Sequence, residues 1–168
     1  MSMSKKKKDN LLIGSLLIVF GLVFLITSTL QNKGEFAYIK VKNQTLFSVN
    51  LTDGSFKTNP LEVVIIATEA PRLAGTTIWV NDYESYDLEM GSGIVRYQDG
   101  SKTYYYIQGN LGYVVILYDQ TKQQIRIDQE TSPYNICSKQ GWSDTKPIIC
   151  LPNYVTIEFN DTEADVSI

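Results

Sequence analysis

The sequence contains no histidine and only two cysteines, Cys137 and Cys150. Without an imidazole group, Ser-His-Asp and Cys-His catalysis are excluded, and so are metal sites built from histidine. Redox-active cysteines usually show C-x-x-C spacing or a basic neighbour that lowers the thiol pKa. Here 12 residues separate the pair, and Lys139 is the nearby cation. The sequence therefore predicts that the protein is not an enzyme, with no catalytic, cofactor-binding or metal-binding residues assigned.

Basic residues are clustered at the N-terminus, where Lys5–Lys8 form an unbroken run. Without these lysines and Asp9, the chain carries 11 basic and 17 acidic residues, a net charge of −6. A nucleic-acid partner would require clustered lysine and arginine, so this balance argues against one.

A single long segment without charge, residues 11–30, follows the lysines. About 20 apolar residues span a bilayer as a helix, and flanking lysines keep that end in the cytoplasm. We therefore predict a cytoplasmic tail (1–9), a transmembrane anchor helix (10–30) that contacts lipid through residues 11–30, and a linker (31–34). A cleaved signal peptide is the alternative, although residues 27–31 form a poor cleavage site.

The C-terminal part of the chain carries its most specific pattern. S-P-x-x-I-C-x-x-Q-G-W is followed by P-I-I-C-L-P-N-x-V-x-I, and the strand signal is cleanest at residues 154–159. Alternation in this last segment and the preceding apolar run predict a hairpin with Cys150 on its first arm. Pro152 and Asn153 are the expected corner, because proline fixes φ and asparagine tolerates tight turns. The motif residues are Ser132, Pro133, Ile136, Cys137, Gln140, Gly141, Trp142, Pro147, Ile148, Ile149, Cys150, Leu151, Pro152, Asn153, Val155 and Ile157.

This order of residues resembles the NusG domain II (NusG insert domain-like) family of small membrane-anchored bacterial proteins. The resemblance is dense over residues 130–157 and weaker over 35–56, and the middle, 58–106, looks longer than is usual for the family. It implies an all-β domain, a small barrel or sandwich, without assigned catalytic residues. Some relatives are encoded beside systems for extracellular electron transfer or flavin handling.

Three states are open for the two cysteines. In an exported domain two cysteines most often pair, and a structural disulfide would stabilise the fold by roughly 3 kcal/mol. Buried free thiols and a redox-active pair are the other two interpretations.

Turn signals at close intervals separate the segments after the linker into nine to eleven short strands, a pattern typical of a sandwich or barrel. Residues 61–67 have the continuous apolar character of a central strand, and Trp79, within the strand 76–81, is expected in the core. Residues 36–41 and 45–51 alternate around Lys42-Asn43-Gln44, which predicts a hairpin. Asp99-Gly100 is a strong hairpin signal. The predicted domain covers residues 35–160, with 58–106 as an elaborated middle segment and 161–168 as a flexible tail.

Two segments each allow a functional interpretation and a purely structural one. Asp82, Glu84, Asp87 and Glu89 supply oxygens of the kind calcium binds, but their spacing lacks the EF-hand pattern, which favours a solvated loop or edge strand. Tyr104–Tyr106 would bind flat ligands if exposed, whereas tyrosines on a sheet more often pair across strands.

We expect a non-catalytic, membrane-anchored β-domain outside the cytoplasm. It would bind, or act as an accessory to, an unknown membrane or envelope protein. An accessory role in extracellular electron transfer or flavin chemistry is the first alternative, and a thiol-disulfide oxidoreductase is the second. The predicted location is the cell membrane, with one span, the N-terminus in the cytoplasm and the C-terminal domain outside.

Overall fold

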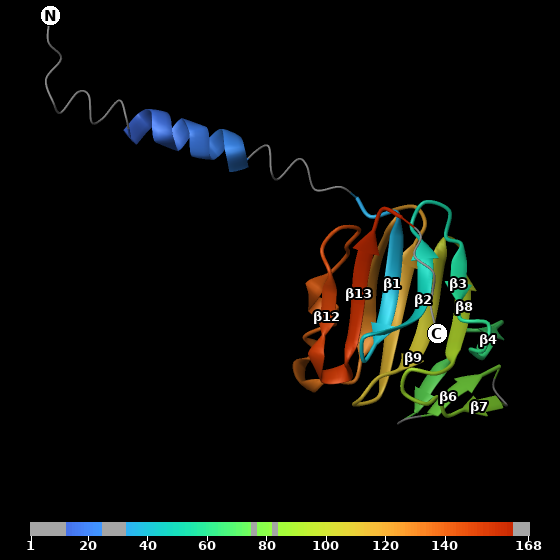
Figure 1. Cartoon of the computed structure of the whole chain (residues 1–168). Helices are drawn as coiled ribbons and strands as arrows, with labels where there is room; N and C mark the ends of the chain where they lie inside the picture. The colour runs from blue at the N-terminus through green and yellow to red at the C-terminus, as the bar shows by residue number, and fades with distance from the viewer. Residues whose placement is uncertain (1–12, 25–32, 75–76, 82–83, 163–168) are drawn as a thin grey trace, which may run out of the picture. The chain divides into compact units, whose positions relative to one another are not determined.

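The computed structural model describes residues 13–24, 33–74, 77–81 and 84–162 (Figure 1). It divides the chain into two compact units, Met1–Asn32 and Lys33–Ile168. In the first unit, residues 13–24 are helical. Among the described residues, no helix is both long enough and apolar enough to cross a membrane. The predicted tail, 1–9, both ends of the predicted span and most of the C-terminal tail lie outside the described residues.

The described part of the second unit is built mainly from β-strands, arranged in three sheets, which confirms the all-β prediction. Sheet A has the order β12 (Ile148–Cys150), β13 (Val155–Asn160), β1 (Phe36–Val41), β2 (Gln44–Asn50) and β3 (Phe56–Thr58). Sheet B has the order β11 (Gln124–Glu130), β10 (Tyr113–Asp119), β9 (Lys102–Gln108), β8 (Ile94–Asp99) and β4 (Val64–Ala67). Sheet C has the order β5 (Arg72–Ala74), β6 (Thr77–Val80) and β7 (Glu84–Tyr86).

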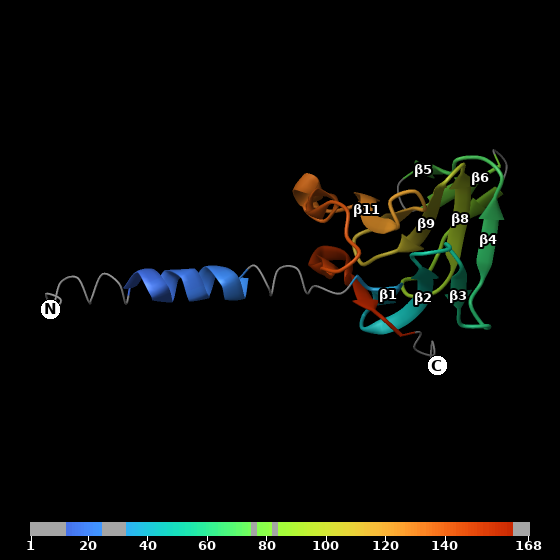
Figure 2. The same ribbon diagram turned by 90° about the horizontal axis from the view of Figure 1, so that it is seen from above.

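Sheets A and B pack face to face and form the main hydrophobic core (Figure 2). Alternate residues of each strand face a single side, so Ile39 of β1 and Ile157 of β13 reach this core from sheet A. Ile107 and Ile116 reach it from sheet B. Of the two architectures expected from the sequence, the described strands form the sandwich.

Sheet C covers part of the other face of sheet B, so the unit has three layers. Ile78 and Val80 of β6 pack against Val95, Tyr106 and Val115 in a second hydrophobic core. β10 therefore lies between two cores, and all seven of its residues are buried. This accounts for its continuous apolar sequence, which is typical of a strand covered on both faces.

The hairpins predicted from turn residues are present. β1 and β2 are joined by Lys42 and Asn43, both with positive φ (50° and 66°), as a two-residue primed turn requires. β8 and β9 are joined at Gly100, whose φ is 58°. The chain thus follows its local turn chemistry closely in the hairpins of both large sheets.

Two predictions about the middle segment are wrong. The run 61–67 is not a central strand, because only Val64–Ala67 forms β4, which lies at the edge of sheet B and pairs in parallel with β8. Leu61, Val63 and Ile66 are exposed. Trp79 is 37% exposed, because β6 turns Ile78 and its alternate neighbour inward and the tryptophan to the other face.

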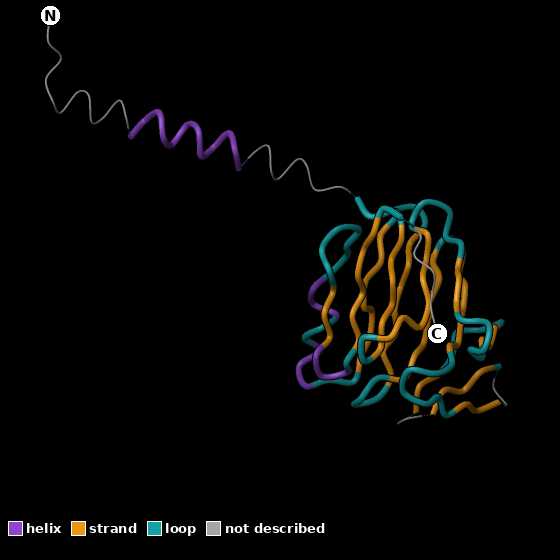
Figure 3. Tube along the Cα trace, in the orientation of Figure 1, coloured by secondary structure: helices purple, strands orange, loops and turns teal. Residues whose placement is uncertain are grey.

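Three short 3₁₀ helices lie in the C-terminal part: η1 (Pro133–Asn135), η2 (Ser138–Gln140) and η3 (Leu151–Asn153) (Figure 3). η3 makes the connection between β12 and β13, so the predicted hairpin is present but its corner differs from the expected one. The left-handed residue of this corner is Tyr154, with φ 55°, rather than Asn153.

Candidate functional site

The candidate site is the C-terminal hairpin and the loop that precedes it, the region of the sequence motif. β12 and β13 pair antiparallel at the edge of sheet A. A disulfide joins Cys150 of β12 to Cys137 of the preceding loop, with the Cα atoms 5.2 Å apart. The two residues are only 0% and 1% exposed. Of the three states open from the sequence, the structure contains the disulfide, and its burial favours a structural pair over a redox-active one, because reactive cysteines are usually partly exposed.

Asn153 connects this hairpin to two other segments. Its side chain is fully buried, and its Oδ1 accepts a hydrogen bond from the Leu111 backbone N–H at 2.9 Å. Its Nδ2 donates to the Thr131 carbonyl at 3.2 Å. Gly109 lies against it so closely that a Cβ there would come within 2.7 Å of the Asn153 Cβ. The asparagine of the motif therefore fixes the corner by tertiary hydrogen bonds.

Gln140 closes the outer edge of β12. Its side-chain Nε2 donates to the Ile149 carbonyl at 2.8 Å, and its Oε1 accepts from the Ile149 N–H at 3.1 Å. The amide thus makes the pair of hydrogen bonds that a neighbouring strand would make. An unpaired strand edge invites pairing with another chain, and this glutamine satisfies the central residue of that edge.

Trp142 anchors the motif loop on β11. The Lys122 Nζ lies 4.1 Å and the Arg126 Cζ 4.7 Å from the centroid of the indole ring, so two cations flank one aromatic group. Next to it, Ser143 exchanges two backbone hydrogen bonds with Ile125, of 2.9 and 3.0 Å. These contacts hold the loop without any strand of its own.

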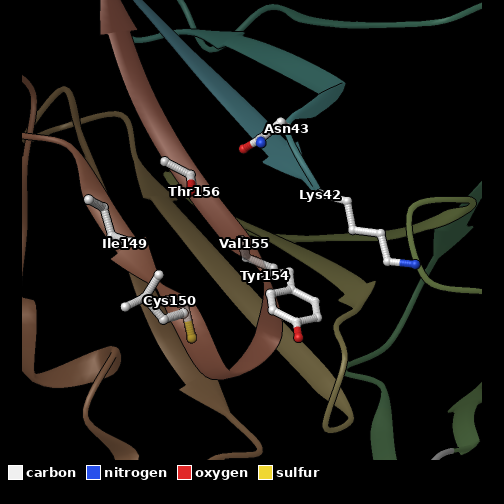
Figure 4. Close-up of a pocket in the computed structure, with 8 residues that line it drawn as sticks. Lys42, Asn43, Ile149, Cys150, Tyr154, Val155 and Thr156 are labelled. Carbon is white, nitrogen blue, oxygen red and sulfur yellow. The ribbon is translucent and has the colours of Figure 1, made fainter.

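A groove of about 390 Å³ lies at the corner of the hairpin. Figure 4 shows Lys42 and Asn43 of the β1–β2 turn on one side of β13, and Ile149 of β12 on the other. The side chains of Ile149, Leu151 and Tyr154 are 49%, 74% and 52% exposed. Three large apolar groups thus reach solvent around a single concave surface.

A buried carboxylate lies behind the disulfide. Glu130 is 9% exposed, and its Oε1 accepts a hydrogen bond from the Cys137 N–H at 2.9 Å. Ile125 and Ile127 of β11 are buried, so strict alternation along the strand would bury Gln129 next. A β-bulge between the pairs Val115–Gln129 and Ile116–Ile127 shifts the pattern by one residue and turns Glu130 inward instead.

The family comparison covers this whole region. The NusG domain II family model matches residues 68–163, more than half of the chain. The chain belongs to the NusG domain II family. The match indicates a small non-catalytic β domain. It includes most of the middle segment, which the resemblance had left unassigned, whereas β1 and β2 lie before it. No curated protein and no solved structure matches the chain.

The structure places the motif residues of this NusG domain II chain along the β12–β13 edge of sheet A and in the loop before it, and they divide by burial. Those that are buried form the interior of the hairpin: Cys137, Ile148, Cys150, Asn153, Val155 and Ile157. Half-buried residues are Ser132, Gly141, Trp142 and Pro152, and exposed ones are Pro133, Ile136, Gln140, Pro147, Ile149 and Leu151. Sequence reasoning missed Glu130, Lys122, Arg126 and Tyr154. Glu130 was missed because the β-bulge shifts the alternation of β11 by one residue. Lys122 and Arg126 were missed because their contacts with Trp142 are tertiary and leave no local sequence pattern.

The two other candidate segments have no comparable geometry. Tyr105 is buried against Phe47, with ring centroids 4.8 Å apart, and Tyr104 packs on Tyr97 at 5.9 Å. Burial raises the pKa of Tyr105 to about 12, so the phenol stays neutral in the fold. In the acidic segment, Asp82 lies outside the described residues, and Glu84 begins β7.

Proposed function

We propose that this NusG domain II protein is a non-catalytic β-domain held at the outer face of the cell membrane, where it binds a membrane or envelope protein as an accessory module. The uncharged run at residues 11–30 and the lysines before it support the anchor and the orientation. The family membership supports the absence of catalysis.

The observation that carries the binding role is the exposed apolar cluster of Ile149, Leu151 and Tyr154 around the groove. Contiguous apolar surface on a soluble domain marks interaction sites. Lys42, which lines the groove, adds one cation at its rim. A partner that fits would bring an apolar side chain to the groove and an acidic or carbonyl oxygen to the lysine.

The position of the groove also supports this role. Residues 34 and 35 are held at the start of β1 by hydrogen bonds from Gly34 N–H to Asp144 O and from Leu51 N–H to Glu35 O, both 2.8 Å. The groove lies at the other end of β1, because Lys42 N–H donates to Tyr154 O at 3.0 Å. Six strand residues span about 20 Å. The groove is therefore kept away from the point where the chain leaves for the membrane.

Chemical cross-linking in cells tests the binding role. We expect the full chain to form an adduct with a partner, and Leu151→Asp to abolish it, because a carboxylate in an apolar contact cannot be desolvated cheaply. Leu61→Asp is the matched control: Leu61 is a similarly exposed leucine, at 79%, but it lies outside the groove. Equal adducts from both variants would reject the groove as the binding surface. No adduct at all, with envelope complexes unchanged after gene deletion, would reject the binding role.

Protease treatment of intact cells tests the orientation separately. We expect protease to cleave the domain after residue 33 without lysis, since the lysines hold the opposite end in the cytoplasm. A domain that is cleaved only after lysis would contradict the proposal. The electron-transfer alternative stays a prediction, and an unchanged ferric-reductase activity after loss of the gene would count against it.

A further inference from the structure

The buried carboxylate of Glu130 has a hydrogen-bond partner at only one of its two oxygens among the described residues. The Oε1 of Glu130 accepts from the Cys137 N–H, but its Oε2 is buried and has no hydrogen-bond partner among the described residues. Buried polar atoms nearly always have a partner, because leaving one without costs free energy. An orphaned carboxylate oxygen therefore indicates a group that the fold does not itself supply.

The surroundings of this carboxylate are chemically specific. A carboxylate oxygen of Glu130 and the Sγ atoms of Cys137 and Cys150 all lie within 4.8 Å of one another, and all three residues are buried. Ser132 is close in the chain, and its Oγ is also buried without a partner among the described residues. Glu130 and Ser132 both line an open surface depression of about 410 Å³, which the two cysteines do not line.

We propose that, once the disulfide is reduced, Cys137, Cys150 and Glu130 form a zinc site. Two thiolates and one carboxylate are ligands that Zn²⁺ takes, with a fourth position filled by water or by the Ser132 hydroxyl. Zinc–ligand distances of about 2.0–2.3 Å place neighbouring ligand atoms roughly 3.5 Å apart. Reduction would have to let the two sulfurs separate by roughly 1.5 Å from their bonded distance, and the flexible glutamate side chain would have to move by about 1 Å, to bring the three groups into range.

The site exists only in the reduced protein, because the bonded sulfurs of a disulfide cannot act as thiolates. A dithiol reductant supplies two electrons and two protons, the sulfur–sulfur bond breaks to give two thiols, and the reductant becomes a disulfide. Binding of Zn²⁺ then releases the two thiol protons to solvent. The metal would join the motif loop to β12 in place of the covalent bond, so the hairpin would stay fixed in both redox states.

Cobalt titration of the full chain tests the proposal. The protein, kept in detergent, is reduced with a dithiol, freed of it under nitrogen, and checked for two thiols per chain. Co²⁺ is then added, and the thiolate-to-cobalt charge-transfer absorption is followed, with Zn²⁺ as the competitor. We expect one Co²⁺ per reduced chain, displaced by Zn²⁺, and no such absorption from the oxidised chain.

Variants at two glutamates distinguish metal coordination by the Glu130 carboxylate from a general effect of removing one negative charge. Glu130→Gln retains the acceptor for the Cys137 N–H but removes the anionic ligand. We expect it to weaken binding at least about tenfold, because even loss of an outer-shell partner of a metal ligand has an effect of that size. Glu89→Gln, at an exposed glutamate, should bind as the natural chain does. Equal affinity in the two variants would overturn the assignment of Glu130.

A thermal measurement covers the case in which Glu130→Gln does not fold. The reduced natural chain should melt at a higher temperature with excess Zn²⁺ than without it, because a ligand that binds only the folded state stabilises it. An unchanged melting temperature, an absent charge-transfer band, or a disulfide that the dithiol does not reduce in the folded chain would each overturn the proposal.

Discussion

Asn153 shows how a single side chain can determine the shape of the site. Its amide is fully buried and links the hairpin corner to the Leu111 N–H and the Thr131 carbonyl. A turn propensity alone would place this residue at the surface. The motif asparagine is thus a tertiary connector, and the corner conformation passes to Tyr154.

The first prediction concerns this connector. Asn153→Ala removes the buried amide and leaves the Leu111 N–H and the Thr131 carbonyl, both in part-buried hydrogen bonds, without this partner. The free energy of unfolding should therefore fall by about 2 kcal/mol. Denaturant unfolding of the full chain measures it. Asn160→Ala, at an exposed asparagine at the end of β13, is the control and should stay within about 0.5 kcal/mol. Equal losses in the two variants would show that the buried hydrogen bonds contribute nothing.

The second prediction concerns buried tyrosines at alkaline pH. Desolvation raises the pKa of Tyr118 from 10.0 to about 12, and its hydroxyl donates to the Leu51 carbonyl at 2.8 Å. Burial raises the pKa of Tyr106 to about 12 as well. A raised pKa in the fold means that the unfolded chain loses the proton first. Stability is therefore complete below pH 10 and falls as the pH rises toward 12.

Denaturant midpoints at several pH values between 8 and 12 measure this loss. Tyr118→Phe should reduce the slope of stability against pH, because one of the groups that bind the proton more tightly in the fold is gone. It should also cost about 1 kcal/mol at neutral pH through the lost hydrogen bond. Tyr134→Phe, at a tyrosine that is 85% exposed, should change neither quantity. A slope unaltered by Tyr118→Phe would contradict the argument.

At the scale of elements, the sequence predicted the hairpins, but it did not predict which strands lie at the edges of the sheets. Two-residue hairpin turns require positive φ, and asparagine and glycine adopt it most readily, so residues such as Asn43 and Gly100 can be recognised as turn positions from the sequence. Whether an apolar run lies inside a sheet or at its edge depends on which strand pairs with it. β4 and β12 both read as buried strands, yet each is an edge strand with exposed apolar side chains at Ile66 and Ile149.

The disulfide between Cys137 and Cys150, one of the three states considered from the sequence, is present in the structure. It closes a loop with a sequence separation of 13, in which η2 and β12 are joined by residues 141–147 without a strand. The third prediction is that the double variant Cys137→Ser, Cys150→Ser loses about 3 kcal/mol of unfolding free energy, mainly through the freer unfolded chain. Denaturant unfolding checks it. The reduced natural chain, without metal, is the matched control and should lose a similar amount. A loss below about 1 kcal/mol would show that the loop is held by Trp142 and Gln140 instead.

At the scale of the whole domain, the layers differ in how much buried surface supports them. The main core contains 20 buried residues drawn from sheets A and B and the motif loop. The second core contains seven, and among the described residues sheet C contributes only Ile78 and Val80 to it. No property of the sequence predicted this third layer, because its short described strands bury their apolar side chains, Ile78, Val80 and in part Tyr86, in the core shared with sheet B.

This imbalance gives the last prediction, on local opening. Segments with few buried apolar contacts open with a lower free energy than the global unfolding reaction. In hydrogen exchange, the amides of β5, β6 and β7 should therefore exchange well before those of β9 and β10. Ile78→Ala should speed exchange in sheet C and leave β1 and β13 unchanged. Ile116→Ala, in the main core, should speed exchange in sheets A and B together. If Ile78→Ala lowered protection equally everywhere, the three layers would form one cooperative unit, and sheet C would be as essential to the fold as the two sheets that form the main core.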